Sequence, residues 1–241
     1  MNKLTFALCG FLLVTNFSFG QDFGKLKNKV NETLKTENSS SLSEGEVVSG
    51  LKEALNKGVE KGVDQLSKPD GYFKDPQIKI PLPQEAKDVE SKLRQMGQGA
   101  KVDEAIESIN RAAEDAANGA KDIFVDAIKN MSVTDAMGLL KGDDDAATRF
   151  LESSTRAALV EKFRPVIKAS LEKVGATKHW NSVFTTYNKI PLVKKVNPDL
   201  EEYATNKAID GLFVQIAKEE LEIRKNPGAR VTDLLKKVFG N

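Results

Sequence analysis

Residues 43–66 read SEGEVVSGLKEALNKGVEKGVDQL and combine a helix start with one continuous apolar stripe. Ser43 and Glu46 have the spacing of a capping box, in which each side chain satisfies a free backbone N–H of the first turn. Behind this start, apolar or small residues recur every three or four positions: Val48, Leu51, Leu55, Val59, Gly62 and Leu66. The stretch predicts a long amphipathic helix, and Gly58 and Gly62 on one face predict close contact with a neighbouring helix or hairpin.

The same spacing recurs along most of the remaining chain. It predicts further helices at residues 84–96, 102–131, 132–140, 143–175, 199–225 and 231–239. Asn118-Gly119 is a candidate break inside the second of these, and Pro165 is expected to kink or restart the fourth. These segments predict a molecule built by packing helix against helix.

Residues 69–83 interrupt the helical pattern. Asp70-Gly71 is a turn signal, and residues 72–73 and 78–80 favour extended structure. Prolines at positions 76, 81 and 83 cannot donate to a strand ladder, so any pairing here is a small edge hairpin. The predicted fold is therefore all-α: a single helical bundle of about nine helices with one small β-hairpin near residues 70–82.

The first 20 residues have the pattern of a secretory signal peptide. Lys3 precedes an apolar stretch from Leu4 to Phe19, and small residues at Ser18 and Gly20 suit cleavage before residue 21. We expect export to the periplasm or the extracellular space, with no transmembrane segment in the mature chain. The predicted organisation is a signal peptide at 1–20, an amphipathic helix and polar linker at 21–42, and an all-α globular domain at 43–241. Cleavage would also remove Cys9, so a packed core rather than disulfides must stabilise the mature protein.

Composition excludes several classes of function. The chain carries 36 Lys plus Arg and 35 Asp plus Glu, so it lacks the basic excess that nucleic-acid binding requires. It has one His and one Cys, and it contains no P-loop, no G-x-G-x-x-G and no G-x-S-x-G motif. We therefore predict no metal site, no cofactor and no assignable catalytic residue.

The most informative polar residues lie near Arg111. Glu107, Arg111 and Glu114 share one face of a predicted helix, and Glu220 and Arg224 repeat the four-residue spacing near the C-terminus. One interpretation is that Arg111, Glu114, Glu220 and Arg224 form polar networks that fix helix register. The alternatives are a pocket that binds a polar ligand and a carboxylate pair for acid–base hydrolysis.

Two other groups of residues have a structural and a functional interpretation. Trp180 and Tyr187, with His179 beside them, belong to a core cluster or form an aromatic wall that stacks on a ligand. Asp143-Asp144-Asp145 precede a predicted helix, where acids cap the first turn and complement its dipole. The twelfth residue from Asp143 is Ser154, so the calcium-loop template fails.

Six strings occur in an order that resembles the bacterial domain-of-unknown-function family 4197. They are GLKEAL at 50–55, IKIPLP at 78–83, NRAAE at 110–114, DAAT at 145–148, DGLF at 210–213, and a tail from Glu220 to Gly240 that includes Arg224 and Asn226-Pro227. The resemblance covers residues 43 to 241. It implies an exported or envelope-associated helical domain without an established activity, and it provides no catalytic residues.

The sequence favours an exported, envelope-associated helical protein that acts as a non-catalytic binding or structural module. One alternative is a carrier of an apolar or amphipathic ligand between helices. A second is a carboxylate-based hydrolase acting on an envelope polymer. The expected partner is an unidentified envelope protein or an amphiphilic ligand.

Overall fold

The computed structural model describes residues 43–173, 175, 177 and 199–239. The predicted signal peptide (1–20), the segment at 21–42, and Trp180 and Tyr187 with His179 lie outside the described residues. The elements in chain order are α2 (Glu44–Leu66), η1 (Gln84–Ala86), α3 (Lys87–Gln95), α4 (Gly99–Ala117), α5 (Ala120–Asn130), α6 (Val133–Leu140), α7 (Ala146–Lys173), α9 (Leu200–Lys225), η2 (Pro227–Ala229) and α10 (Asp233–Phe239).

The predicted all-helical bundle is confirmed, but the predicted number of elements is not. Eight α-helices occur in the described residues, against about nine predicted for the chain, and no β-strand occurs among them. The predicted break at Asn118-Gly119 is present, because α4 ends at Ala117 and α5 begins at Ala120. Pro165 does not restart a helix, since α7 continues through it to Lys173.

The β-hairpin predicted near residues 70–82 is wrong. Residues 67–83, which we call the strap, form successive turns in which backbone N–H groups bond to carbonyls three or four residues earlier, such as Gly71 to Lys68 and Lys79 to Asp75. The physical reason is that a side chain, rather than a partner strand, takes up the backbone hydrogen-bonding groups of this segment. The Asn110 side chain binds both the N–H and the C=O of Ile80, which are the groups a partner strand would use.

Two helices begin at the capping boxes expected of such sequences. In α2, the backbone N–H of Glu46 donates to the Ser43 hydroxyl (3.3 Å), and the Ser43 N–H donates to the Glu46 carboxylate (2.8 Å). In α6, Ser132 and Asp135 make the same reciprocal pair. Each box satisfies two backbone donors that the first turn leaves free.

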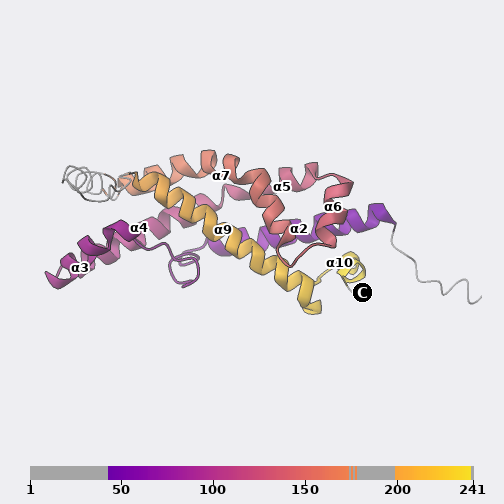
Figure 1. The fold of residues 1–241 in the computed structure, drawn as a ribbon, viewed down its shortest axis with the longest axis horizontal. Helices are drawn as coiled ribbons and strands as arrows, with labels where there is room; N and C mark the ends of the chain where they lie inside the picture. The colour runs from indigo at the N-terminus through magenta and orange to yellow at the C-terminus, as the bar shows by residue number, and fades with distance from the viewer. Residues whose placement is uncertain (1–42, 174, 176, 178–198, 240–241) are drawn as a thin grey trace, which may run out of the picture. The chain divides into compact units, whose positions relative to one another are not determined.

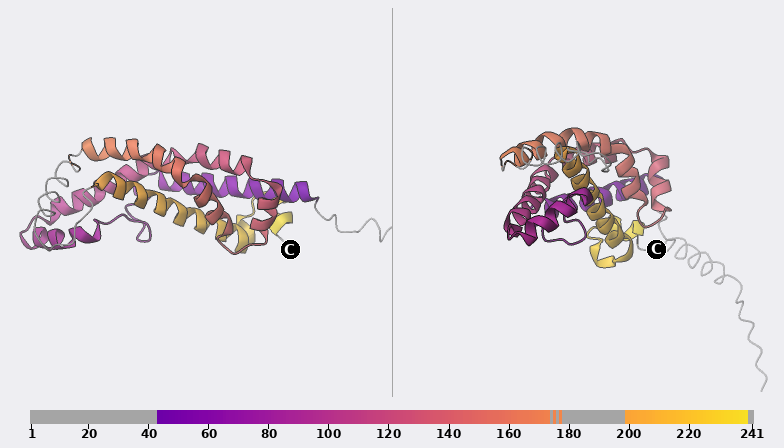
Figure 2. Two further views of the ribbon diagram at one scale, coloured as in Figure 1. Left: turned by 45° about the horizontal axis from the view of Figure 1, so that its top comes forward. Right: turned by 60° about the vertical axis from the view of Figure 1, so that its left-hand side comes forward.

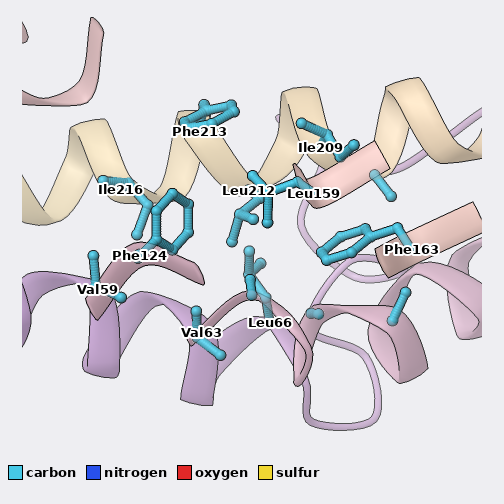
Figure 3. Close-up of a cluster of buried hydrophobic side chains, with 14 of the residues drawn as sticks. Val59, Val63, Leu66, Phe124, Leu159, Phe163, Ile209, Leu212, Phe213 and Ile216 are labelled. Carbon is cyan, nitrogen blue, oxygen red and sulfur yellow. The ribbon is translucent and has the colours of Figure 1, made fainter. Parts of the chain in front are cut away.

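Helix α9 organises the packing. It contacts α2 and α7, while α4 and α5 pack against α7, and α10 packs against α2 (Figures 1 and 2). Side chains from α2, α5, α7 and α9 gather in one core, which Figure 3 shows: Val59, Val63, Leu66, Phe124, Leu159, Phe163, Ile209, Leu212, Phe213 and Ile216. Each such side chain, once buried, contributes about 1.5–3 kcal/mol to folding.

The close contact predicted at Gly58 and Gly62 is present between α2 and α9. A Cβ atom at Gly62 would lie 3.1 Å from the Ile216 Cδ1 atom, and one at Gly58 would lie 3.5 Å from the Glu219 Cβ atom. The missing side chains let the two helix backbones approach. Among the described residues, no helix is both long enough and apolar enough to cross a membrane.

Candidate functional site

The Glu114 carboxylate holds the strap on α4. Glu114 is 3% exposed, and its Oε1 atom accepts hydrogen bonds from the backbone N–H groups of Tyr72 and Phe73, both at 3.1 Å. Its Oε2 atom accepts from Arg111 Nη1 at 2.8 Å. A buried charge of this kind is stable only when it is fully hydrogen-bonded, and Glu114 meets that condition with groups from two elements.

Arg111 connects three carboxylates at the edge of the strap. Besides Glu114, it donates from Nη2 to Asp70 (2.8 Å) and to Glu107 (3.1 Å). Hydrogen bonds to Glu114 and then to Asp70 raise the pKa of the Arg111 guanidinium, so it stays charged. Its side chain is 35% exposed, and its guanidinium lies 5.3 Å from the centre of the Phe73 ring. Solvent therefore screens the Asp70 and Glu107 pairs far more than the Glu114 pair.

Other side chains fix the remaining length of the strap. Asn110 forms a two-way pair with the Ile80 backbone, with both bonds at 2.8 Å. The fully buried Tyr72 hydroxyl donates to the Ala208 carbonyl of α9 (2.7 Å), and Tyr203 of α9 donates to the Pro81 carbonyl (2.9 Å). The strap is therefore held by side chains and backbone of two helices far from it in sequence.

Glu220 caps α7 from α9. It is 7% exposed, and its carboxylate accepts from the backbone N–H groups of Ala147 (3.1 Å) and Thr148 (2.8 Å) and from the Thr148 hydroxyl (2.8 Å). These two amides belong to the first turn of α7, where a helix has no internal acceptor for them. The negative charge also complements the helix dipole at that end.

Arg224 completes this second network. Its guanidinium donates to Glu220 from Nε (2.9 Å) and Nη2 (2.7 Å), and Nη2 also donates to the Leu139 carbonyl at the end of α6 (2.9 Å). A cavity of about 20 Å³ adjoins the pair, with Leu55 and Phe239 among its lining residues. That volume is enough for roughly one water molecule.

The predicted site residues thus form two separate clusters. Arg111 and Glu114 belong to the strap network, Glu220 and Arg224 belong to the α6–α7–α9 network, and the two share no hydrogen-bond partner. The structure does not bring them together in one pocket. Among the described residues, no group of three or more His, Cys, Asp or Glu side chains is arranged to hold a metal ion.

Both clusters have the same chemical design. In each, a buried carboxylate accepts from two successive backbone amides and from an arginine three or four residues away on its own helix. Both oxygens of each carboxylate already accept hydrogen bonds from groups of the protein. The arrangement is suited to locking elements together, and acid–base chemistry would require breaking those contacts.

Sequence reasoning missed several of these roles. The sequence marks Asp70 only as part of a turn, although its carboxylate binds Arg111, and it marks Asn110 only as part of the string NRAAE. A signal for Asn110 existed, because it is a polar residue beside the apolar Ile109 on a helix with a buried face. No local pattern could have linked Asp70 to a residue 41 positions later.

The expected capping of α7 by its preceding acids also needs correction. Asp143 and Asp145 pair with Arg149, and Asp144 pairs with Lys225, so these side chains form surface ion pairs. Glu220 accepts from the first-turn amides instead. The reason is geometric, since α9 delivers a buried carboxylate directly to the end of α7.

Four of the six strings quoted for the family resemblance meet in these two networks. Ile80 pairs with Asn110, and Ala147 and Thr148 donate to Glu220, which in turn accepts from Arg224. A family model described as "Protein of unknown function (DUF4197)" matches residues 41–240. No curated protein and no solved structure matches the chain.

Proposed function

The chain belongs to the DUF4197 family of proteins of unknown function, and from that membership we propose that it is an exported protein of the cell envelope. In this proposal it acts as a non-catalytic binding or structural module. Export rests on the signal-peptide pattern of residues 1–20, with Lys3 before the apolar stretch and cleavage after Gly20. After cleavage the chain is a helical domain without a cysteine, and its stability comes from its core and its polar networks.

The non-catalytic role is supported by the burial and the hydrogen bonding of Glu114 and Glu220. Each carboxylate is buried and already accepts from two backbone amides and an arginine. Removal of either would leave donors without partners inside the fold. Glu114 and Glu220 therefore support a structural role, in which they hold neighbouring elements in fixed positions. A binding or structural module requires a rigid scaffold of this kind.

The two alternative functions receive less support from the same region. A hydrolase needs a carboxylate that is free to exchange a proton with its substrate, and neither Glu114 nor Glu220 is free in this sense. A carrier needs a cavity of about 300 Å³ or more. The cavity beside Glu220 and Arg224 has about 20 Å³.

Native mass spectrometry on protein released gently from the envelope of its source tests the proposal. The expected result is a mature chain that begins at Gln21 and travels with a protein partner in fixed stoichiometry. Recovery of the chain with residues 1–20 intact from the cell interior would refute export. A tightly bound lipid in place of a protein partner would support the carrier instead.

A catalytic role would show itself in the turnover and the melting temperature of variants of the same protein. If Glu114→Gln or Glu220→Gln abolished turnover of an envelope polymer while the melting temperature stayed unchanged, the proposed scaffold role would be wrong. The expected result is the opposite, with a lower melting temperature in both variants because each substitution breaks a buried network.

A further inference from the structure

Helix α10 is attached to the bundle in a different way from the strap and from helices α2, α4, α7 and α9, which all make hydrogen bonds to other elements. Leu235 is fully buried against Ala54 of α2 and Ile223 of α9, and Phe239 packs on the same cluster. Within the described residues, no hydrogen bond or ion pair joins α10 to another element, since those of Asp233 and Lys236 are local. Lys237 adds only a longer-range attraction to Glu46. Apolar contact therefore accounts for most of the attachment of α10, and the attraction between Lys237 and Glu46 adds to it.

Opening α10 breaks none of the hydrogen bonds made by the described polar residues beneath it. Beneath it, Glu220 keeps its bonds to Ala147, Thr148 and Arg224, and Arg224 keeps its bond to the Leu139 carbonyl. The cavity that Phe239 lines already separates α10 from this pair. The free energy needed to open α10 is therefore mainly the loss of the apolar contacts made by Leu234, Leu235, Val238 and Phe239.

The strap provides the contrast. Lifting it from the bundle would strip Glu114 of two amide donors and Asn110 of the Ile80 backbone, leaving a buried charge and a buried amide without partners. Groups left in that state are costly, so opening the strap requires more free energy than opening α10. Elements held by few apolar contacts open first.

We propose that α10 is a C-terminal lid that opens as a unit while the rest of the bundle stays folded. Its hinge is the segment at 226–232, where Arg230 stays fixed to α9 through the carbonyls of Ile223 and Arg224. Opening uncovers an apolar strip that includes Gly50 and Ala54, with the Glu220–Arg224 pair beside it. The lid is a property of the fold and does not depend on what the protein binds.

Gly50 is the position where the fit of the lid can be changed selectively. A Cβ atom at Gly50 would lie 2.7 Å from the Val238 Cγ2 atom and 3.0 Å from the Leu234 Cγ atom, both on α10. Gly50→Ala should therefore push the lid outward. Gly45→Ala is the matched control on the same helix, because nothing lies within 4 Å of a Cβ atom there.

The experiment follows thiol labelling of Ala54→Cys in the full chain with Cys9→Ser. Ala54 is 2% exposed and lies under Leu235, so its labelling reports lid opening. Gly50→Ala should raise the labelling rate by about tenfold, and Leu235→Ala by about 30-fold or more, while Gly45→Ala leaves it unchanged. Low urea concentrations should hardly affect the rate, because opening the lid exposes little surface.

A second probe separates lid opening from global unfolding. Ala112→Cys places a thiol at a fully buried position of α4, where labelling requires the bundle to unfold. The lid predicts that Cys at 54 reacts much faster than Cys at 112 in folded protein. Equal rates at every urea concentration, or a Gly50→Ala effect no larger than that of Gly45→Ala, would overturn the proposal.

Discussion

Glu114 and Glu107 lie on the same helix and bind the same arginine, yet their surroundings give them different weight. The Glu114 side chain is 4% exposed and also accepts two strap amides, whereas the Glu107 side chain is 48% exposed and binds only Arg111. In water the Glu107 pair is screened. Burial, rather than the presence of an ion pair, therefore identifies the residue on which the strap depends.

Glu114→Gln should destabilise the protein by about 2–4 kcal/mol. The amide retains one oxygen for the Tyr72 and Phe73 N–H groups, but it presents an NH₂ group or a weaker acceptor to Arg111. Urea denaturation measures the change. Glu107→Gln is the control and should shift stability by no more than about 0.5 kcal/mol, so equal losses in both variants would contradict this account.

At the scale of elements, the strap packs against α9 at a glycine, where a side chain would not fit. A Cβ atom at Gly211 would lie 2.7 Å from the Tyr72 Cε1 atom and 3.3 Å from the Ile78 Cβ atom. The Tyr72 ring is buried, and its hydroxyl bonds to Ala208, so the ring cannot move aside easily. The string DGLF therefore includes a position where the strap requires the absence of a side chain.

Gly211→Ala should lower stability by about 2 kcal/mol or more because it overpacks this contact. Gly138→Ala is the matched helical control, since nothing lies within 4 Å of a Cβ atom at Gly138 in α6. That change should raise stability by about 0.5–1 kcal/mol through helix propensity. Thermal melts of both variants give the comparison, and a stabilising Gly211→Ala would show that the strap is not packed as described.

The capping boxes of α2 and α6 should make stability depend on acid. Hydrogen bonds from the Ser43 backbone and hydroxyl lower the pKa of Glu46 below 4.5, and those from the Ser132 hydroxyl and backbone lower the pKa of Asp135 below 3.8. Each contribution is fully present above the unfolded-state pKa and is lost as the pH falls through the lower folded-state pKa.

The double variant Glu46→Gln with Asp135→Asn tests this sign. Its stability relative to the unsubstituted protein should be lower at neutral pH, and the difference should shrink as the pH falls below 4.5 and then below 3.8. Denaturation midpoints across that range measure the difference. A gap that widens on acidification would contradict the assigned direction.

The sequence predicted those elements whose stabilising contacts are local, and it failed where the contacts come from residues far away in the chain. Apolar periodicity and local caps found α2, the break before α5 and the start of α6, because the causes lie within one or two turns. The hairpin prediction failed because Asn110, 30 positions after Ile80, took the place of a partner strand. Similarly, the cap of α7 comes from Glu220, which is 73 positions after Ala147.

At the scale of the whole molecule, the two hydrogen-bond networks stabilise different parts of one bundle and share no residue. The Glu114 network joins α4, the strap and α9, and the Glu220 network joins α6, α7 and α9. The sequence spacing indicates the Arg111–Glu114 and Glu220–Arg224 pairs, since each pair lies on one helix. It could not find the backbone groups that these pairs hold, because those belong to other elements.

Combining Glu114→Gln with Glu220→Gln should therefore give additive losses of stability. The sum of the two single effects should match the double variant within about 0.5 kcal/mol, because the networks share no partner. Urea unfolding of the two single variants and the double variant provides the cycle. A coupling of several times that size would mean that the clusters communicate through α9.

The cap that Glu220 provides for α7 also sets an order of events in time. A ribosome or a secretion channel delivers the chain from its N-terminus, so the first turn of α7 emerges 73 residues before its acceptor. Until then the Ala147 and Thr148 amides lack the Glu220 carboxylate, and the Tyr72 hydroxyl lacks the Ala208 carbonyl. A chain that ends before α9 therefore lacks both the acceptor for the first turn of α7 and the carbonyl that holds Tyr72, and Leu200–Lys225 supplies the two together.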